Sequence, residues 1–173
     1  MKTKTPPFSN PVAVATLHGV AHLRLVPDAG QRAAMARFCG LHSITAFESL
    51  LDITARANGV VEIKGQLHAE VEPVCVVSME PFSETIREEI EASFAEAALI
   101  EKLTRRAEEN GVIDFEPPDL IENGVIDPSA LSLEWLMLAL DPYPRKPGAE
   151  FQGLSEDIAP LSPFAALKAL KPE

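Results

Sequence analysis

Residues 61–71 have the clearest strand pattern in the chain and read Val61-Glu62-Ile63-Lys64-Gly65-Gln66-Leu67-His68-Ala69-Glu70-Val71. Apolar and polar side chains alternate along this stretch, which is typical of a β-strand with one buried face and one face in water. Asn58-Gly59, just before it, favours a tight turn, and Ser43 to Ala55 on the other side of that turn alternates as well. The sequence therefore predicts an antiparallel hairpin over 43–55 and 61–71.

Further extended segments are predicted on both sides of this hairpin. Pro11 to Leu17 and His22 to Val26 have strand patterns, and the apolar run Pro73 to Met79 is short enough for a buried strand. Ser83 to Phe94 fits either a helix or a strand, because its apolar residues recur every four positions and share one side in both conformations. Its conformation stays open at this point.

Three helices are predicted from capping residues and apolar spacing. The first runs over 28–39 and ends at Gly40, and the second runs over 96–110 and ends at Gly111. The third runs over 128–140 and is apolar almost all round, so it is either the buried centre of the domain, which we favour, or a helix covered by a partner.

These elements predict a single α+β domain over residues 11–148. We expect a curved antiparallel sheet, barrel-like or half-open, covered by two to three helices. Residues 1–10 are expected to form a flexible N-terminal arm, and residues 149–173 a mobile tail with a short terminal helix.

Composition excludes several classes of protein. The chain has 173 residues, of which 46% are hydrophobic, and a formal net charge of -11. It should therefore fold, while its charge repels phosphate backbones, so that nonspecific nucleic-acid binding is disfavoured and no DNA partner is expected. No apolar stretch is long enough for a membrane span. Two cysteines, Cys39 and Cys75, cannot build a disulfide framework, so a soluble protein of the cytoplasm is expected.

The negative charge is concentrated in the middle of the chain. Residues 80–122 contain 13 acidic and 4 basic side chains, a net charge of -9, whereas the remainder contains 13 acidic and 11 basic ones, a net charge of -2. This segment is therefore expected either to form a solvated surface or to meet a cationic partner.

Motifs for catalysis or metal binding are absent from the sequence. It contains no phosphate-binding glycine loop, no Gly-x-Ser-x-Gly elbow and no His-Glu-x-x-His motif. His18 and His22 are four residues apart but have no third ligand nearby. Cys75 and Ser78 have the spacing of a redox pair with one thiol replaced, but Cys75 lies in an apolar run, where a thiol is expected to stay protonated and inert. We therefore predict no catalytic residue, no metal site and no cofactor.

A proline-rich loop supplies the best candidates for binding. It reads Asp141-Pro142-Tyr143-Pro144-Arg145-Lys146-Pro147-Gly148. Arg145 and Lys146 beside Tyr143 could contact a phosphate or an acidic group, with Lys168 and Lys171 in the tail as helpers. A solubilising connector after the last core helix is the alternative.

Four stretches of the chain together resemble a known family. They read Gly65-Gln66-Leu67-His68-Ala69 leading to Cys75-Val76-Val77-Ser78-Met79-Glu80-Pro81-Phe82; Ile126-Asp127 before a helix with Glu134 and Leu136; Leu138-Ala139-Leu140-Asp141-Pro142-Tyr143-Pro144-Arg145-Lys146-Pro147-Gly148; and Pro163-Phe164-Ala165-Ala166-Leu167. Their order resembles the YceD family, the large ribosomal RNA subunit accumulation proteins, over most of residues 8–171. This resemblance favours a strand for residues 83–94.

The resemblance implies a non-enzymatic cytoplasmic factor that supports accumulation of the large-subunit rRNA and ribosome assembly, with rRNA or the pre-ribosome as partner. Many members of that family have Cys-x-x-Cys where this chain has Cys75 to Ser78, and a cysteine cluster where it has Asp141 to Gly148. This chain resembles a branch without those cysteines, so the metal that some members are predicted to bind is not expected here.

Two other classes of function stay open. The chain could be an acidic protein-interaction module unrelated to ribosomes, or a small hydrolase or redox enzyme with an unrecognised site. An enzyme would need a concave pocket that holds polar residues with perturbed pKa values.

Overall fold

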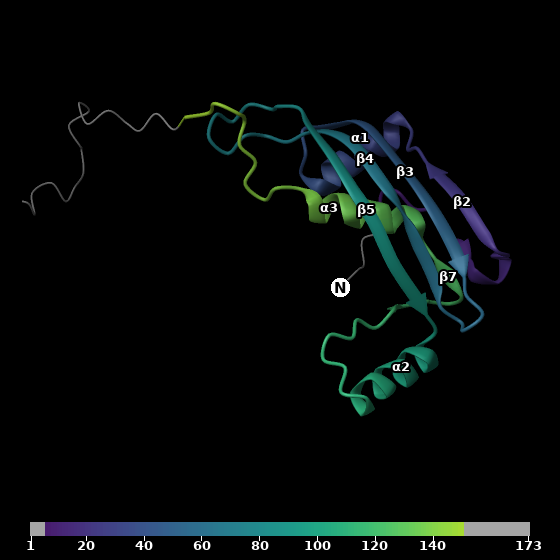
Figure 1. The fold of residues 1–173 in the computed structure, drawn as a ribbon. Coiled ribbons are helices and arrows are strands. Elements are labelled where there is room, and N and C mark those ends of the chain that lie inside the picture. Colours follow the sequence, from purple (N-terminus) through teal and green to yellow (C-terminus); the bar gives the residue numbers. More distant parts are fainter. Residues whose placement is uncertain (1–5, 151–173) are drawn as a thin grey trace, which may run out of the picture.

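A five-stranded sheet forms the centre of the computed structural model, which describes residues 6–150 (Figure 1). In chain order the elements are β1 (Val12–Ala13), a 3-10 turn (Val14–Thr16), β2 (Val20–Leu25), α1 (Ala29–Cys39), β3 (Ser43–Ala55), β4 (Val61–Glu72), β5 (Glu84–Ala95), α2 (Ala97–Glu109), β6 (Asp119–Leu120), β7 (Val125–Ile126) and α3 (Pro128–Ala139). The α+β class is therefore confirmed.

The sheet has the strand order β2-β3-β4-β5-β6 and is not closed into a barrel. Neighbouring strands are antiparallel except for β5 and β6, which run parallel. The predicted hairpin is confirmed as β3 and β4, with Ala55 opposite Val61 at the turn. The segment 83–94 is a strand, which settles the alternative that its spacing left open.

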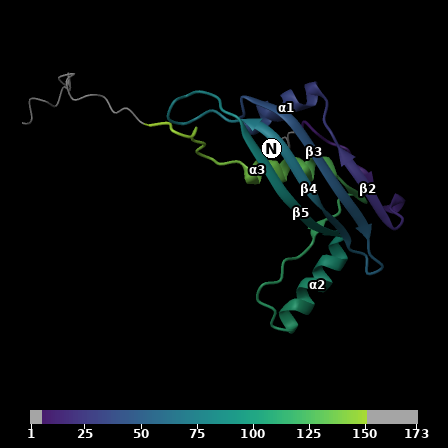
Figure 2. The ribbon, with the colours of Figure 1, turned by 45° about the horizontal axis from the view of Figure 1, so that its top comes forward.

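Alternation along the strands separates an inner face from an outer one. On β4 the side chains of Ile63 and Leu67 are buried, whereas those of Lys64 and Gln66 are exposed. Met35 of α1 and Leu133 of α3 belong to the same hydrophobic core as this inner face, so both helices cover one side of the sheet. The other side of β3, β4 and β5 lies open (Figure 2).

The capping residues that predict the helices are confirmed. The carboxylate of Asp28 accepts a hydrogen bond from Gln31 N, and the Gln31 side chain accepts one from Asp28 N, each at 2.8 Å. Gly40 ends α1 with φ 72°. Asp127 accepts from the backbone N–H groups of Ser129 and Ala130 at the start of α3.

The strand predicted over Pro11 to Leu17 is wrong in extent. Only Val12–Ala13 is extended, and it pairs with β7 in a separate two-stranded sheet. The backbone then turns, because Leu17 N donates to Val14 O at 3.0 Å within the chain instead of to a neighbouring strand.

The buried strand predicted over Pro73 to Met79 is also wrong. A bridge between Val74 and Pro81 replaces a ladder there, and the chain reverses direction between them. Within this run Pro73 and Cys75 are buried, whereas Val76 and Met79 of the turn are exposed. Apolar content alone does not distinguish such a turn from a buried strand.

Part of the predicted N-terminal arm packs on the domain. Phe8 is buried, and its ring meets that of Phe47 edge-on with centroids 5.7 Å apart. Ser9 Oγ and Asn10 N both donate to the carboxylate of Asp127. The short terminal helix predicted in the tail lies outside the described residues.

Candidate functional site

Two segments that lie far apart in sequence meet at one end of the sheet. The turn 75–80 follows β4, and the proline-rich loop 141–148 follows α3 (Figure 1). Val76 N donates to Pro144 O at 2.9 Å, and Lys146 Nζ donates to Glu80 Oε2 at 2.8 Å. The loop that holds the predicted site residues is therefore anchored on the cysteine turn.

The turn surrounds the Cys75 sulfur with backbone donors. Val77 N and Ser78 N each lie 3.4 Å from Cys75 Sγ, while Met79 N donates to Cys75 O at 2.9 Å and Met79 takes a φ of 60°. Hydrogen bonds from the Ser78 side chain first, and then from the backbone N–H groups of Ser78, Lys146 and Val77, lower the pKa of the Cys75 thiol from 9.0 to about 6.

The prediction of a protonated Cys75 thiol is therefore wrong. Burial raises the pKa of a thiol, but donors aimed at the sulfur oppose that effect and outweigh it here. Cys39 shows the opposite case, since burial without such donors raises its pKa to about 11.

The structure separates the roles of the predicted loop residues. Tyr143 is 72% exposed, and its N–H donates to Asp141 Oδ1 at 2.8 Å, which fixes the turn. Lys146 is held by Glu80, and this pair raises the pKa of the lysine and lowers that of the carboxyl. Arg145 is exposed and forms no ion pair within residues 6–150. Lys168, like Lys171, lies outside that range.

The acidic segment 80–122 forms the β5 border of the sheet and a projection beyond it. Helix α2 and the chain up to β6 extend from the end of β5, away from the sheet (Figures 1 and 2). One contact of α2 lies at the β3–β4 turn, where Leu99 Cδ2 is close to Gly59. An acidic excursion that stands out in this way is accessible to a partner.

A six-residue sequence occurs twice in the chain, and the two copies differ in how deeply their side chains are buried. Glu-Asn-Gly-Val-Ile-Asp occurs at 109–114 and again at 122–127. In the second copy Ile126 is buried in the sheet with β1, whereas in the first copy Ile113 is 95% exposed and Val112 is 53% exposed. The tip of the α2 excursion therefore presents apolar side chains within an acidic surface.

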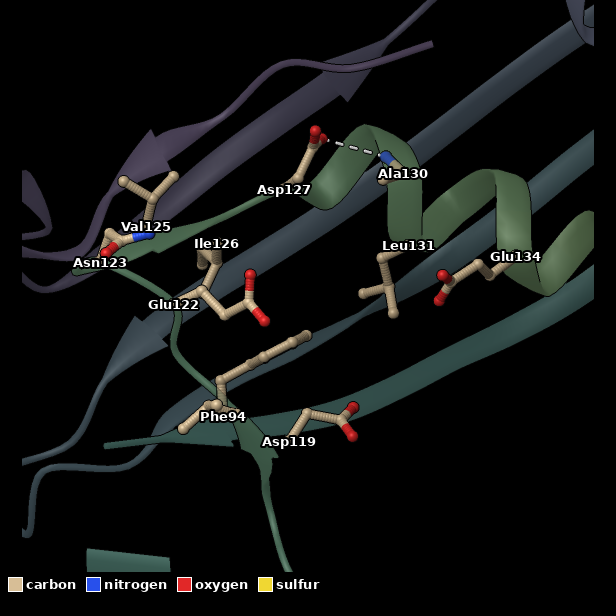
Figure 3. Close-up of a pocket in the computed structure, with 11 residues that line it drawn as sticks. Phe94, Asp119, Glu122, Asn123, Val125, Ile126, Asp127, Ala130, Leu131 and Glu134 are labelled. Carbon is tan, nitrogen blue, oxygen red and sulfur yellow. Dashed lines mark hydrogen bonds between the residues drawn. The ribbon is translucent and has the colours of Figure 1, made fainter. Parts of the chain in front are cut away.

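Sequence reasoning missed an acidic hollow beside α3. It has a volume of about 540 Å³ and is lined by four carboxylates, those of Asp119, Glu122, Asp127 and Glu134 (Figure 3). Phe94 and Leu131 lie at its apolar side. Because the first and the last of these acids are 15 residues apart in sequence, the turn at 123–124, which returns the chain to α3, is needed to bring them together. Such a hollow favours a cationic group over an anion.

Metal ligands do not cluster in the described part of the chain. No group of three or more His, Cys, Asp or Glu side chains between residues 6 and 150 has a geometry that could hold a metal ion. His22 instead forms a pair with Asp52, at 2.6 Å across β2 and β3. Over the same residues no helix has the length and apolar character that a membrane crossing requires.

Comparison with protein-family models, with curated proteins and with solved structures finds no match for this chain.

Proposed function

We propose that this chain is a non-enzymatic binding factor of the cytoplasm that supports accumulation of the large-subunit rRNA and assembly of the large ribosomal subunit. In this proposal a basic ribosomal protein binds the acidic segment 80–122. The loop 141–148 contacts RNA locally. The resemblance of the four sequence stretches supplies the ribosomal context, and the geometry supports binding rather than catalysis.

The acidic excursion around α2 carries this proposal. It projects beyond the sheet, has an excess of carboxylates and exposes Ile113 almost completely. Ribosomal proteins are rich in lysine and arginine because they neutralise rRNA, so an acidic surface with an apolar centre complements a ribosomal protein that has not yet bound its RNA. Binding there would keep such a protein from nonspecific contacts.

The loop 141–148 supports the RNA contact in the proposal. Tyr143 offers an exposed ring on which an unpaired base can stack, and Arg145 offers a guanidinium for phosphate. These two side chains alone cannot overcome the repulsion between RNA and a chain with a net charge of -11. In this proposal the basic protein therefore binds first, and the contact with RNA forms afterwards.

An acidic module unrelated to ribosomes is the alternative that the same surface supports. The alternatives differ in the partner, because only the ribosomal proposal requires that the bound protein belongs to the large subunit. The enzyme alternative has weaker support, since the Cys75 sulfur is activated but fully buried.

Matched charge variants test the proposal. Glu108→Gln with Glu109→Gln removes two charges from the end of α2, and Glu70→Gln with Glu150→Gln removes two exposed charges elsewhere. The amount of tagged chain that sediments with large-subunit precursors is measured in a gradient. We expect the α2 variant to lose about fivefold in association, at about 0.5 kcal/mol for each exposed charge, and the control to keep it. Equal association of both variants would refute a role for this surface.

A further inference from the structure

Strand β5 has a long free edge. The sheet order places β5 between β4 and β6, but β6 pairs only with Phe94 and Ala95. Over residues 84–93 no strand of the described structure lies beside β5 on that side. The side chains of Thr85, Arg87 and Glu91 on this part of the strand are exposed, and within residues 6–150 the outward backbone is contacted at Glu89, whose C=O accepts from Trp135 Nε1.

Two hydrogen bonds show which backbone groups face outward. Ala95 O accepts from Ile121 N at 2.9 Å, and Glu89 O accepts from Trp135 Nε1 at 3.0 Å, and neither donor belongs to β4. The pairing of β5 with β4 runs without a bulge from Glu84 to Phe94. Because successive residues of a strand alternate sides, the odd-numbered residues 85 to 93 direct their N–H and C=O groups to the free edge.

The edge also has a distinct charge. Residues 84–91 contain Glu84, Glu88, Glu89 and Glu91 against the single cation Arg87, a net charge of -3. A second copy of the chain would bring a second strand of the same charge, and acidic edges of this kind oppose self-association. A strand rich in lysine or arginine would instead find opposite charges along its length.

A hollow at the edge suits a basic side chain. It has a volume of about 600 Å³ and is lined by Glu116, Asp119 and Trp135, together with the pair Lys64–Glu91 and with Glu62, which pairs with Arg56. Within residues 6–150, Glu116 and Asp119 form no ion pair, so these two carboxylates are the ones a further cation would meet. A lysine or arginine can lay its aliphatic stem and cation on an indole ring and place its charge near carboxylates. This hollow lies beside the outward groups of β5 at Glu91.

We propose that the free edge of β5 binds an extended, lysine- or arginine-rich segment of a partner protein by strand addition, with one basic side chain in the Trp135 hollow. This inference rests on the proposed function, since the segment would belong to the basic partner, and it specifies how that partner is held. Main-chain hydrogen bonds give affinity in this mode, and the charges select the strand.

Two substitutions of Arg87 separate strand addition from simple charge attraction. Arg87→Ala removes a cation and keeps the outward N–H, whereas Arg87→Pro removes both. Proline is tolerated on an edge strand when its missing N–H faces solvent, as it does here. The probe is a short labelled peptide in which lysine alternates with valine and threonine, and binding to the full chain is measured by fluorescence anisotropy.

We expect Arg87→Ala to bind the peptide as tightly as the native chain or more tightly, and Arg87→Pro to bind it about tenfold more weakly. A peptide N-methylated on every residue, which has no N–H donor on either edge, should bind neither variant well. Equal binding by Arg87→Ala and Arg87→Pro would overturn strand addition, because both lack the cation and differ only in the edge.

Amide exchange of the native chain gives a second measurement that does not depend on a variant. The peptide should slow hydrogen exchange at Arg87 N and Glu91 N, while Glu88 N, which faces β4, keeps its rate. Protection absent at Arg87 and Glu91 would contradict the proposal. If the peptide adds to β5 but no large-subunit partner is recovered from cells, the proposed ribosomal function is wrong and the edge site is retained. If a large-subunit partner is recovered but the peptide does not add to β5, the edge site alone is wrong.

Discussion

At the scale of single residues, the surroundings of Cys75 determine its chemistry. The Ser78 side chain is the largest cause of the lowered pKa. Ser78→Ala should therefore raise the pKa of Cys75 from about 6 toward 9.0, as measured by thiolate absorbance during a pH titration. Cys39 does not interfere, because its pKa of about 11 lies outside this range. Ser93→Ala, on the open face of β5, is the control, and an unchanged Cys75 pKa in Ser78→Ala would show that the hydroxyl has no such role.

The same lowered pKa predicts a dependence of stability on pH. An unfolded thiol binds its proton below about pH 9, whereas the folded Cys75 stays ionised down to about pH 6. This contribution to stability is therefore present above pH 9 and lost as the pH falls from 9 to 6. The urea midpoint of the native chain should rise with pH across this window, and that of Cys75→Ala should rise less. Parallel curves for the two proteins would contradict a folded thiolate.

A buried pair of serines connects α3 to the sheet. Ser132 Oγ donates to Pro128 O at 2.8 Å and lies 2.9 Å from Ser49 Oγ, and both side chains are fully buried. Ser132→Ala leaves the Ser49 hydroxyl without a partner, which costs about 1–3 kcal/mol. The double variant Ser49→Ala with Ser132→Ala leaves no orphaned hydroxyl, so urea unfolding should find it more stable than Ser132→Ala alone. A double variant that is less stable would show that the two sites act independently.

At the scale of elements, alternation and capping residues predict β3, β4, α1 and α3 because these signals are local. The turn around Cys75 was not predicted, since its conformation depends on a bond from Val76 N to Pro144 O, 68 residues away. The conformation of β5 could not be decided from its spacing alone, because pairing with β4 determines it.

Gly65 marks a close approach that alternation does not detect. It lies at an inward position of β4, and a Cβ built there would be 2.0 Å from Leu50 O, a backbone atom that cannot move aside. Gly65→Ala should therefore push β3 and β4 apart and destabilise the fold by about 3 kcal/mol or more, measured by thermal or urea unfolding. His68→Ala, on the outer face of the same strand, should change stability by less than about 0.5 kcal/mol. A stable Gly65→Ala variant would contradict this packing.

At the scale of the whole molecule, the sequence identified the two charged surfaces but not their geometry. It predicted that Tyr143, Arg145 and Lys146 bind a ligand together. In the structure Lys146 instead pairs with Glu80, while Arg145 is exposed. The acidic hollow beside α3 and the free edge of β5 depend on tertiary contacts, so no local pattern could indicate them.

Reversal of the loop charges tests the RNA contact. Arg145→Glu with Lys146→Glu should reduce crosslinking of the chain to rRNA by about fivefold or more, because lost phosphate contacts weaken binding directly. The domain should stay folded, since both side chains lie at the surface. Arg37→Glu, a single charge reversal on the exposed end of α1, is the control for a general effect of added negative charge. Crosslinking at the native level would remove the loop from the binding surface.

Recovery of the tagged chain from cells identifies the RNA and the proteins that it binds. The chain is crosslinked, recovered at moderate salt before and after nuclease treatment, and its bound RNA and proteins are sequenced. We expect a basic large-subunit protein that stays bound after nuclease treatment, and large-subunit rRNA crosslinked at the loop 141–148. Recovery of a partner that belongs to no ribosomal particle, with no enrichment of large-subunit rRNA, would contradict a role in ribosome assembly.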